Sequence, residues 1–166
     1  MEARAVTAPH RRVPGSDIVL VIDPGMAFGT AEHGTTRGCL RLLERAVGPG
    51  QRVLDVGAGS GILAIAAARL GAGDVLALEG DPLATEALAE NVALNGVTDR
   101  VRWEERWADE GLLSAQAPRD GVVANIESGI LRALMGGFAA VVRPGGWLIL
   151  SGILDHEWAA IRDAAE

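Results

Sequence analysis

The chain has 166 residues, of which 49% are hydrophobic, and both figures suit a single domain with a core of its own. Acidic residues outnumber basic ones by 22 to 15, and the net charge of −7 disfavours direct binding to nucleic acid. The single cysteine, Cys39, excludes an internal disulfide and fits a reducing compartment. The sequence shows no metal-ligand cluster and no apolar run of membrane length, so we expect a cytoplasmic protein with neither a metal site nor a membrane partner.

In chain order, the sequence predicts strands that alternate with helices. Residues 1–16 have two prolines and no usable periodicity, so we expect a mobile lead-in to one domain over 17–166. Strands are predicted at 17–22, 53–56, 74–79, 101–105, 120–126 and 147–151, and helices at 37–47, 62–70, 82–95, 129–142 and after 155. This alternation predicts an α/β fold with a doubly wound, Rossmann-like parallel sheet.

The most informative stretch is the turn between the strand at 53–56 and the helix at 62–70. Its glycines, Gly57, Gly59 and Gly61, follow Asp55, which lies inside the strand. Glycine suits a tight turn that a ligand approaches closely. The spacing is G-x-G-x-G, whereas a pyrophosphate-binding dinucleotide site has G-x-G-x-x-G. The pattern resembles the cofactor loop of methyltransferases that use S-adenosylmethionine.

A second unusual segment, at 26–36, combines small residues with Phe28, His33 and two threonines. Residues 23–30 read Asp-Pro-Gly-Met-Ala-Phe-Gly-Thr, and His and Thr-Thr follow. With the glycine turn, this segment resembles the PrmA family of ribosomal protein methyltransferases. The resemblance implies the strand order 3-2-1-4-5 and a lid over the cofactor, with contacts from Phe28, Thr30 and Thr36.

Two features of this segment leave alternatives open. In the PrmA family the loop usually reads Gly-Thr-Gly-x-His-x-Thr-Thr, whereas this chain has Ala31 in place of the third residue. The alternative role for Thr35 or Thr36 is to cap the helix predicted at 37–47.

Two acidic residues stand at the turn after the strand at 74–79. Asp81 directly precedes Pro82, which is the arrangement of a helix N-cap followed by proline at the first helical position. Glu79 lies 20 residues after Gly59 and is the freer carboxylate. An acid at this position can accept hydrogen bonds from both ribose hydroxyls of an adenosine ligand. We therefore predict that Glu79 binds the cofactor.

Two further candidates follow later strands. Related enzymes often have an aspartate for the adenine amino group where this chain has Trp107, which could stack on the ring or merely pack. Asn125 ends an apolar strand, where an amide is costly to bury unless it forms a hydrogen bond. The resemblance places Asn125 beside the methyl group of the cofactor, where it would be the catalytic residue that orients an amine.

The residues after Asn125 bear on the substrate. The sequence Asn-Ile-Glu-Ser lacks the prolines and aromatic residue with which related enzymes stack a flipped base, so a base substrate is disfavoured. Glu127 could attract a cationic amine or simply begin the next helix. We predict a methyltransferase for amino groups of a protein, and the resemblance implies a basic ribosomal protein as the substrate. The alternatives are a small-molecule methyltransferase and a cofactor-binding partner subunit with little activity of its own.

The last predicted strand, at 147–151, is almost wholly apolar and would lie at a sheet edge. Enzymes with this fold normally add a final antiparallel hairpin, which this sequence lacks. Because an open apolar edge invites pairing, we expect either a fragment of a longer protein or an edge covered by 17–22, by a further domain or by a partner.

Overall fold

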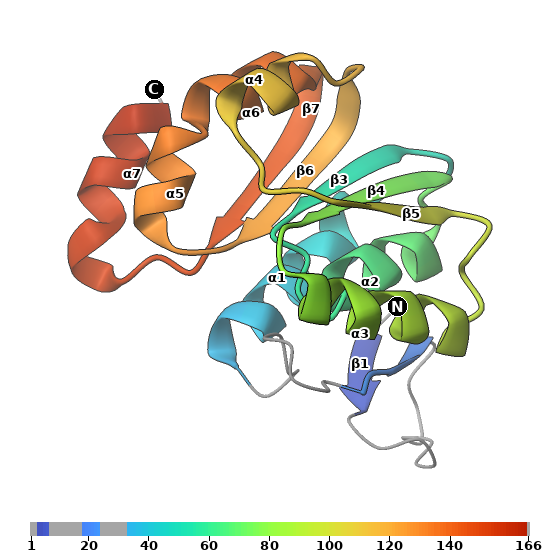
Figure 1. The fold of residues 1–166 in the computed structure, drawn as a ribbon. Coiled ribbons are helices and arrows are strands. Elements are labelled where there is room, and N and C mark those ends of the chain that lie inside the picture. Colours follow the sequence, from blue (N-terminus) through green and yellow to red (C-terminus); the bar gives the residue numbers. More distant parts are fainter. Residues whose placement is uncertain (1–2, 7–17, 24–32, 166) are drawn as a thin grey trace.

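The computed structural model describes residues 3–6, 18–23 and 33–165, and it has an α/β fold (Figure 1). Its centre is a parallel sheet of five strands in the order β5-β4-β3-β6-β7. These strands are β3 (Arg52–Val56), β4 (Asp74–Glu79), β5 (Val101–Glu105), β6 (Arg119–Asn125) and β7 (Val142–Ser151). Counted from β3, the order is 3-2-1-4-5, which confirms the predicted doubly wound fold.

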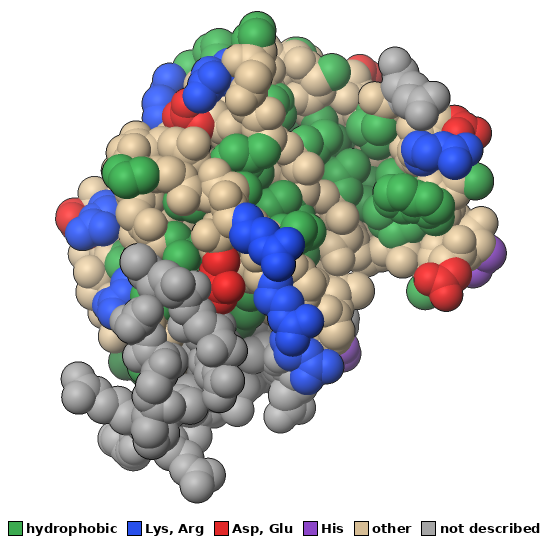
Figure 2. Space-filling model, turned by 180° about the vertical axis from the view of Figure 1, so that it is seen from behind, with side chains coloured by type: hydrophobic (Ala, Val, Ile, Leu, Met, Phe, Trp, Pro, Cys, Tyr) green, Lys and Arg blue, Asp and Glu red, His purple; other side chains and the backbone are tan. Residues whose placement is uncertain are grey.

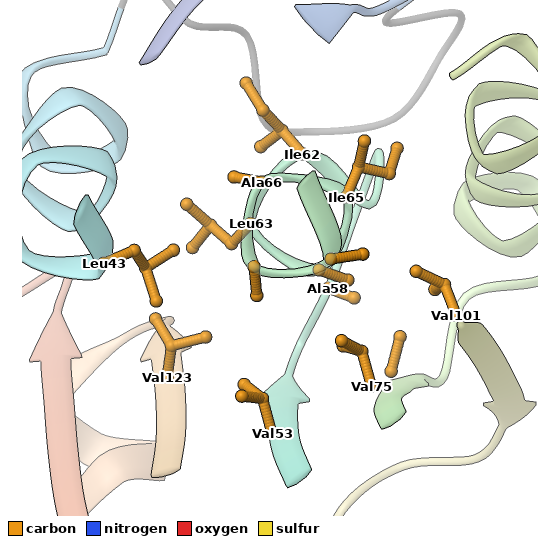
Figure 3. Close-up of a cluster of buried hydrophobic side chains, with 14 of the residues drawn as sticks. Leu43, Val53, Ala58, Ile62, Leu63, Ile65, Ala66, Val75, Val101 and Val123 are labelled. Carbon is orange, nitrogen blue, oxygen red and sulfur yellow. The ribbon is translucent and has the colours of Figure 1, made fainter. Parts of the chain in front are cut away.

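Helices cover both faces of this sheet, and each strand contributes alternate residues to the two sides. On one face lie α1 (Gly34–Ala46), α2 (Ile62–Leu70) and α3 (Pro82–Leu94), packed around the apolar cluster in Figure 3. On the other lie α4 (Glu110–Ser114), α5 (Ser128–Ala133), α6 (Met135–Val141) and α7 (Trp158–Ala165), which follows the short helix η1 (Asp155–Glu157). The three central strands, β3, β4 and β6, are buried on both sides, as their apolar runs require, whereas most residues of the edge strands β5 and β7 are at least partly exposed.

The first strands differ from the prediction. Ala3–Val6 forms a strand, β1, where we expected a lead-in without a folded element, and it pairs in parallel with β2 (Ile18–Val21). The sequence does not predict β1, because this strand reads Ala-Arg-Ala-Val and alanine is depleted in strands, whereas β2, of the same length, consists only of apolar β-branched residues and leucine. In the described part of the chain β2 pairs with β1 and not with β7, so the expectation that 17–22 covers the β7 edge is wrong.

The helix predicted at 129–142 is divided into α5 and α6 at Leu134, whose backbone lies at φ −98° and ψ 0°. The cause is tertiary packing. A methyl group on Gly137 would collide with Leu113, so α6 can lie this close to α4 only because it carries glycine there. The break at Leu134 redirects the chain onto α4, a helix that we did not predict.

Residues 143–146, between the helix predicted at 129–142 and the strand predicted at 147–151, lie within β7, because this strand pairs with β6 on both sides of them. Val142 pairs with Arg119, and pairing resumes at Trp147 opposite Gly121. Four residues therefore bulge out of β7, and Gly145 within them has φ 74°. At its other side, β7 is the edge of the five-stranded sheet, as predicted.

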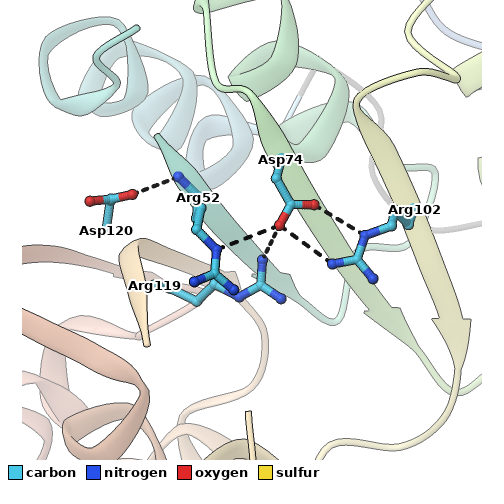
Figure 4. Close-up of polar contacts among 5 residues, drawn as sticks. All are labelled: Arg52, Asp74, Arg102, Arg119 and Asp120. Carbon is cyan, nitrogen blue, oxygen red and sulfur yellow. Dashed lines mark hydrogen bonds and ion pairs between the residues drawn. The ribbon is translucent and has the colours of Figure 1, made fainter. Parts of the chain in front are cut away.

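An ion-pair cluster joins the amino ends of the strands, opposite the edge where the strands end (Figure 4). Asp74 Oδ2 lies 2.9 Å from Arg119 Nη1 and 3.7 Å from Arg52 Nε, and Oδ1 lies 3.1 Å from Arg102 Nε. Burial raises the pKa of Asp74, but the hydrogen bond from Arg102 and the charges of Arg102 and Arg119 outweigh it, so the pKa lies below its usual value. One carboxylate thus links β3, β4, β5 and β6.

Exposed hydrophobic side chains include Leu154, Trp158 and Ile130, on the segments from α5 to α7. Figure 2 shows hydrophobic side chains gathered at the end of the molecule that carries α7. Among the residues that the structure describes, no helix has the length and apolar character needed to cross a bilayer.

Candidate functional site

The predicted site residues in the described structure gather at one edge of the sheet. Asp55 lies on β3, Glu79 ends β4, Trp107 follows β5 and Asn125 ends β6. Because the strands are parallel, their carboxyl ends meet at this edge, where α/β proteins bind ligands. Phe28 and Thr30 lie outside the described residues and stay predictions.

The glycine loop, residues 57–61, leads from β3 into α2. Gly57, Gly59 and Gly61 have φ of 72°, 53° and 80°, a conformation that other residues resist. A methyl group on Gly57 would collide with Ile126, and one on Gly61 with Leu88. At these two positions protein packing requires glycine, in addition to the ligand approach that we inferred from the spacing.

Glu79 is buried and bonded to the glycine loop. Its Oε2 accepts a hydrogen bond from the Gly59 amide at 2.8 Å, and its Oε1 accepts one from the Asp81 amide at 2.9 Å. The carboxylate is therefore less free than its place after the strand suggested, but each oxygen keeps a second lone pair for a ligand. Asp81 is the N-cap of α3, as predicted, since its Oδ1 accepts from the Leu83 amide at 2.9 Å.

Asp55 is the second buried carboxylate at this edge. Its Oδ2 accepts from the Ala64 amide in α2 at 2.9 Å, whereas Oδ1 has no hydrogen-bond partner among the described residues. The pKa of Asp55 is raised to about 7, chiefly by burial and also by the charge of Glu79, against the lowering effect of the Ala64 hydrogen bond. An orphaned buried oxygen at the glycine loop is a position that a cationic ligand would satisfy.

Trp107 is 72% exposed, so it does not belong to the core. Its ring lies against Gly80, where a Cβ atom would collide with the indole. The Arg106 amide also donates to the Glu79 carbonyl at 2.7 Å, which ties the segment after β5 to the end of β4. An exposed indole thus stands next to the predicted ribose acceptor.

Thr36 and Asn125 are joined across the site. Asn125 Nδ2 donates to Thr36 Oγ1 at 3.4 Å, and Thr36 is buried while Asn125 is partly exposed. Since α1 begins at Gly34 and the side chain of its N-cap, His33, makes no capping hydrogen bond, Thr35 and Thr36 lie in the first turn and do not cap the helix. The alternative role for these threonines is therefore wrong.

Other residues complete the edge. Glu127 is exposed and occupies the N-cap of α5 without a side-chain capping bond. Cys39, one turn after Thr36, is buried, and burial raises the pKa of its thiol.

Within the described ranges no group of three or more His, Cys, Asp and Glu residues could hold a metal ion. A groove of about 470 Å³ beside α6 and β7 contains none of the predicted site residues.

The sequence analysis missed one polar residue that reaches the glycine loop. Asn91 of α3 is fully buried, and its Nδ2 donates to the Ser60 carbonyl at 2.9 Å. A signal was present, because Asn91 and Asn95 are four residues apart and so share one face of the helix. Periodicity treats such polar residues as solvent-facing, and only the tertiary structure shows that this face is buried.

Comparison with known proteins gives consistent relatives. A ribosomal protein L11 methyltransferase of Dechloromonas aromatica is 52% identical over 148 residues, which is 89% of this chain and 48% of that protein. One of Chloroflexus aurantiacus is 46% identical in an alignment of 167 positions that covers 88% of this chain and 51% of the relative. The chain thus spans about half the length of these curated relatives.

Solved structures agree with these relatives. The crystal structure of a ribosomal protein L11 methylase from Lactobacillus delbrueckii subsp. bulgaricus superposes with a TM-score of 0.85 at 34% identity, covering 98% of this chain and 82% of that one. The family model described as "Ribosomal protein L11 methyltransferase (PrmA)" matches residues 4–166. The glycine loop, the buried acids and Asn125 all lie within this match, and the chain belongs to the PrmA family.

Proposed function

We propose that this chain is the S-adenosylmethionine-binding domain of a methyltransferase that acts on amino groups of a ribosomal protein. The main support is the pair of buried carboxylates, Asp55 and Glu79, beside the glycine loop. The negative charge of Glu79 suits a cofactor with a sulfonium and an ammonium group, and Asp55, whose pKa is about 7, adds to this charge when it is deprotonated. The same charge disfavours a pyrophosphate, for which the glycine spacing is also unsuitable.

The described residues fit the parts of this cofactor. Glu79 is held by the Gly59 and Asp81 amides and would accept hydrogen bonds from the ribose. Trp107 would offer its exposed ring to the adenine, and Asp55 Oδ1 would gain a partner from the cationic end. Phe28 and Thr30 are proposed contacts from the family resemblance.

The chemistry asks for little acid–base machinery. S-adenosylmethionine supplies a methyl group already activated on sulfur. The protein must hold a neutral amine in line with that group at about 3 to 3.5 Å, which provides much of the rate by proximity. Because Asn125 Nδ2 donates to Thr36, the Oδ1 carbonyl is the half of the amide that remains to accept an N–H from the amine. Asn125 would thus orient the amine lone pair.

Glu127 supports a cationic substrate. It is exposed two residues after Asn125, and its side chain caps no helix, so its charge can act on what approaches the site. A lysine or an amino terminus of a basic protein would be attracted as a cation to the Glu127 carboxylate and would lose a proton to solvent before it reacts as a neutral amine, whereas nucleic acid would be repelled.

Calorimetry tests cofactor choice, and a methyl-acceptor assay tests the substrate. We expect the chain to bind S-adenosylmethionine and not NAD, and Glu79→Ala to weaken that binding. When purified ribosomal proteins are supplied as acceptors, radiolabelled methyl groups should then appear on one of them. NAD binding in place of S-adenosylmethionine would refute the cofactor assignment. Transfer only to small molecules in a lysate would refute the protein substrate, and cofactor binding without transfer to any acceptor would favour a partner subunit.

A further inference from the structure

The fully buried amide of Asn91 is the clearest polar feature of the described structure for which the proposed chemistry gives no role. Its Oδ1 accepts from the Asp23 amide at 2.8 Å, and its Nδ2 donates to the Asp23 and Ser60 carbonyls, each at 2.9 Å. One side chain of α3 therefore satisfies both backbone groups of Asp23, two residues after β2, and one carbonyl of the glycine loop.

Asn95, one turn later, contacts the strand and, through a 2.8 Å bond from its Nδ2 to the Asn91 carbonyl, its own helix, but it has no bond to the glycine loop. Its Oδ1 accepts from the Val21 amide at 2.9 Å, and its Nδ2 donates to the Val21 carbonyl at 2.7 Å. Val21 and Asp23 are alternate residues, so their polar groups point to the same side of the chain. The two asparagines thus form, along this side of β2, the hydrogen bonds that a neighbouring strand would form, while β1 pairs with the other side of β2.

The bond to Ser60 has a different consequence. The Ser60 carbonyl that accepts from Asn91 belongs to the peptide unit between Ser60 and Gly61. The Gly61 amide, at the other end of that unit, donates to the Ala58 carbonyl at 2.9 Å. Both ends of the peptide unit are therefore held. Its orientation matters because Gly61 has φ 80° and the neighbouring Gly59 amide donates to Glu79. A change in this peptide unit would displace the predicted ribose acceptor.

We propose that Asn91 is a positioning residue for the cofactor site, which couples the glycine loop to the end of β2. The inference rests on the proposed binding of S-adenosylmethionine. Asn91 touches no predicted cofactor atom and acts through Ser60 and Gly59. A site whose geometry is set before the ligand arrives loses less entropy on binding, so removal of this link reduces affinity. Asn95 has the same chemistry and the same helix face but no bond to the glycine loop, and it is the matched control.

The experiment compares Asn91→Ala with Asn95→Ala in the whole chain, with Asn91→Ser as a second variant should the alanine variant fail to fold. Calorimetry with S-adenosylmethionine gives the affinity, and thermal unfolding gives the stability. Both alanine variants should melt earlier, because each leaves buried backbone groups without partners. We expect the cofactor Kd to rise about tenfold or more in Asn91→Ala and by less than about twofold in Asn95→Ala.

Amide hydrogen exchange provides a readout that a purely structural role would not change. The Val21 amide keeps its Asn95 acceptor in Asn91→Ala. In the wild-type chain, cofactor at the glycine loop should slow exchange at Val21 through Asn91, and in Asn91→Ala it should not. Equal changes in Kd for the two alanine variants, or cofactor-dependent slowing at Val21 that persists in Asn91→Ala, would overturn the coupling. Failure of the wild-type chain to bind the cofactor would instead refute the proposed function.

Discussion

Glu79 and Asp81 are separated by one residue, yet their carboxylates have different tasks. Glu79 is buried and joins β4 to the glycine loop, whereas Asp81 is exposed and caps α3. We therefore predict that Glu79→Ala weakens S-adenosylmethionine binding by about 1.5 to 3 kcal/mol, the range for hydrogen bonds to a charged group. Calorimetry measures this change.

Asp81→Ala is the control for Glu79→Ala. Loss of the cap should cost about 1 kcal/mol of stability and leave the affinity unchanged. Some loss of stability is expected in Glu79→Ala too, because the Gly59 and Asp81 amides lose their acceptor. A folded Glu79→Ala protein with wild-type affinity would remove Glu79 from the site.

The bond between Thr36 and Asn125 predicts an effect on turnover. Its length of 3.4 Å exceeds that of a typical hydrogen bond, so its contribution should lie at the low end of the usual range. We expect Thr36→Val to lower kcat by about three- to tenfold, since the Asn125 amide is then free to rotate. Thr36→Ser keeps the hydroxyl and should retain the rate. Steady-state kinetics on the methyl acceptor decide, and similar losses in both variants would contradict an orienting role.

Asp55 predicts how stability depends on pH. Its pKa in the folded chain, about 7, exceeds the ordinary value of 3.8, so the folded state keeps a proton that the unfolded state releases between these values. The contribution to stability is therefore complete below the lower value and is lost as the pH rises through about 7, with a slope of at most about 1.4 kcal/mol per pH unit.

Urea unfolding at several pH values between about 4 and about 7 measures this slope. Asp55→Asn removes the titrating group, so this variant should lack the pH-dependent contribution of Asp55 to stability. The difference in unfolding free energy between the wild-type chain and the variant should therefore change across this range. A pH-independent difference would show that Asp55 does not hold the proton.

At the scale of elements, Asp74 stabilises the amino ends of the strands. Arg119 is 2% exposed and relies on Asp74 for its charge partner, and its Nε has no hydrogen-bond partner among the described residues. Removal of the Asp74 carboxylate alone leaves the buried charge of Arg119 without this ion-pair partner. We expect Asp74→Ala to cost about 2 to 3 kcal/mol, below the range for fully buried pairs because Asp74 is one-third exposed.

Arg119→Met in β6 tests the same cluster from the other side. It removes the buried charge and leaves Asp74 with Arg52 and Arg102, so we expect a change within about 1 kcal/mol. Chemical denaturation compares the two variants. A larger loss for Arg119→Met than for Asp74→Ala would contradict this account of the cluster.

At the scale of the whole molecule, β7 ends the five-stranded sheet, and no described strand pairs with its outer side. Such an edge pairs with other chains unless a charge blocks it. We predict that the chain self-associates at high concentration and that Leu148→Lys, at a partly exposed position of β7, reduces this association. Leu83→Lys on α3 is the control, because Leu83 is also an exposed leucine but lies away from the edge. Static light scattering measures both, and a wild-type chain that stays monomeric would refute the prediction.

The sequence alone determined the order of the main elements and the kind of ligand-binding edge. Strand and helix periods differ, so apolar runs and amphipathic stretches identify β3 to β7, α2 and α3. The glycine spacing after Asp55 and the proline after Asp81 are local signals, because the backbone at those positions depends on the residue itself.

Only the tertiary structure decided features that depend on contacts between distant residues. The break at Leu134 arises from the packing of α6 on α4, and Asn91 is buried because β2 and the glycine loop meet α3. In the sequence, Glu79 and Asp81 are two nearby acidic residues. Only the fold brings Glu79 to the Gly59 amide, while Asp81 caps α3. Hydrogen bonds between residues far apart in the chain leave no periodic pattern, so a single sequence cannot reveal them.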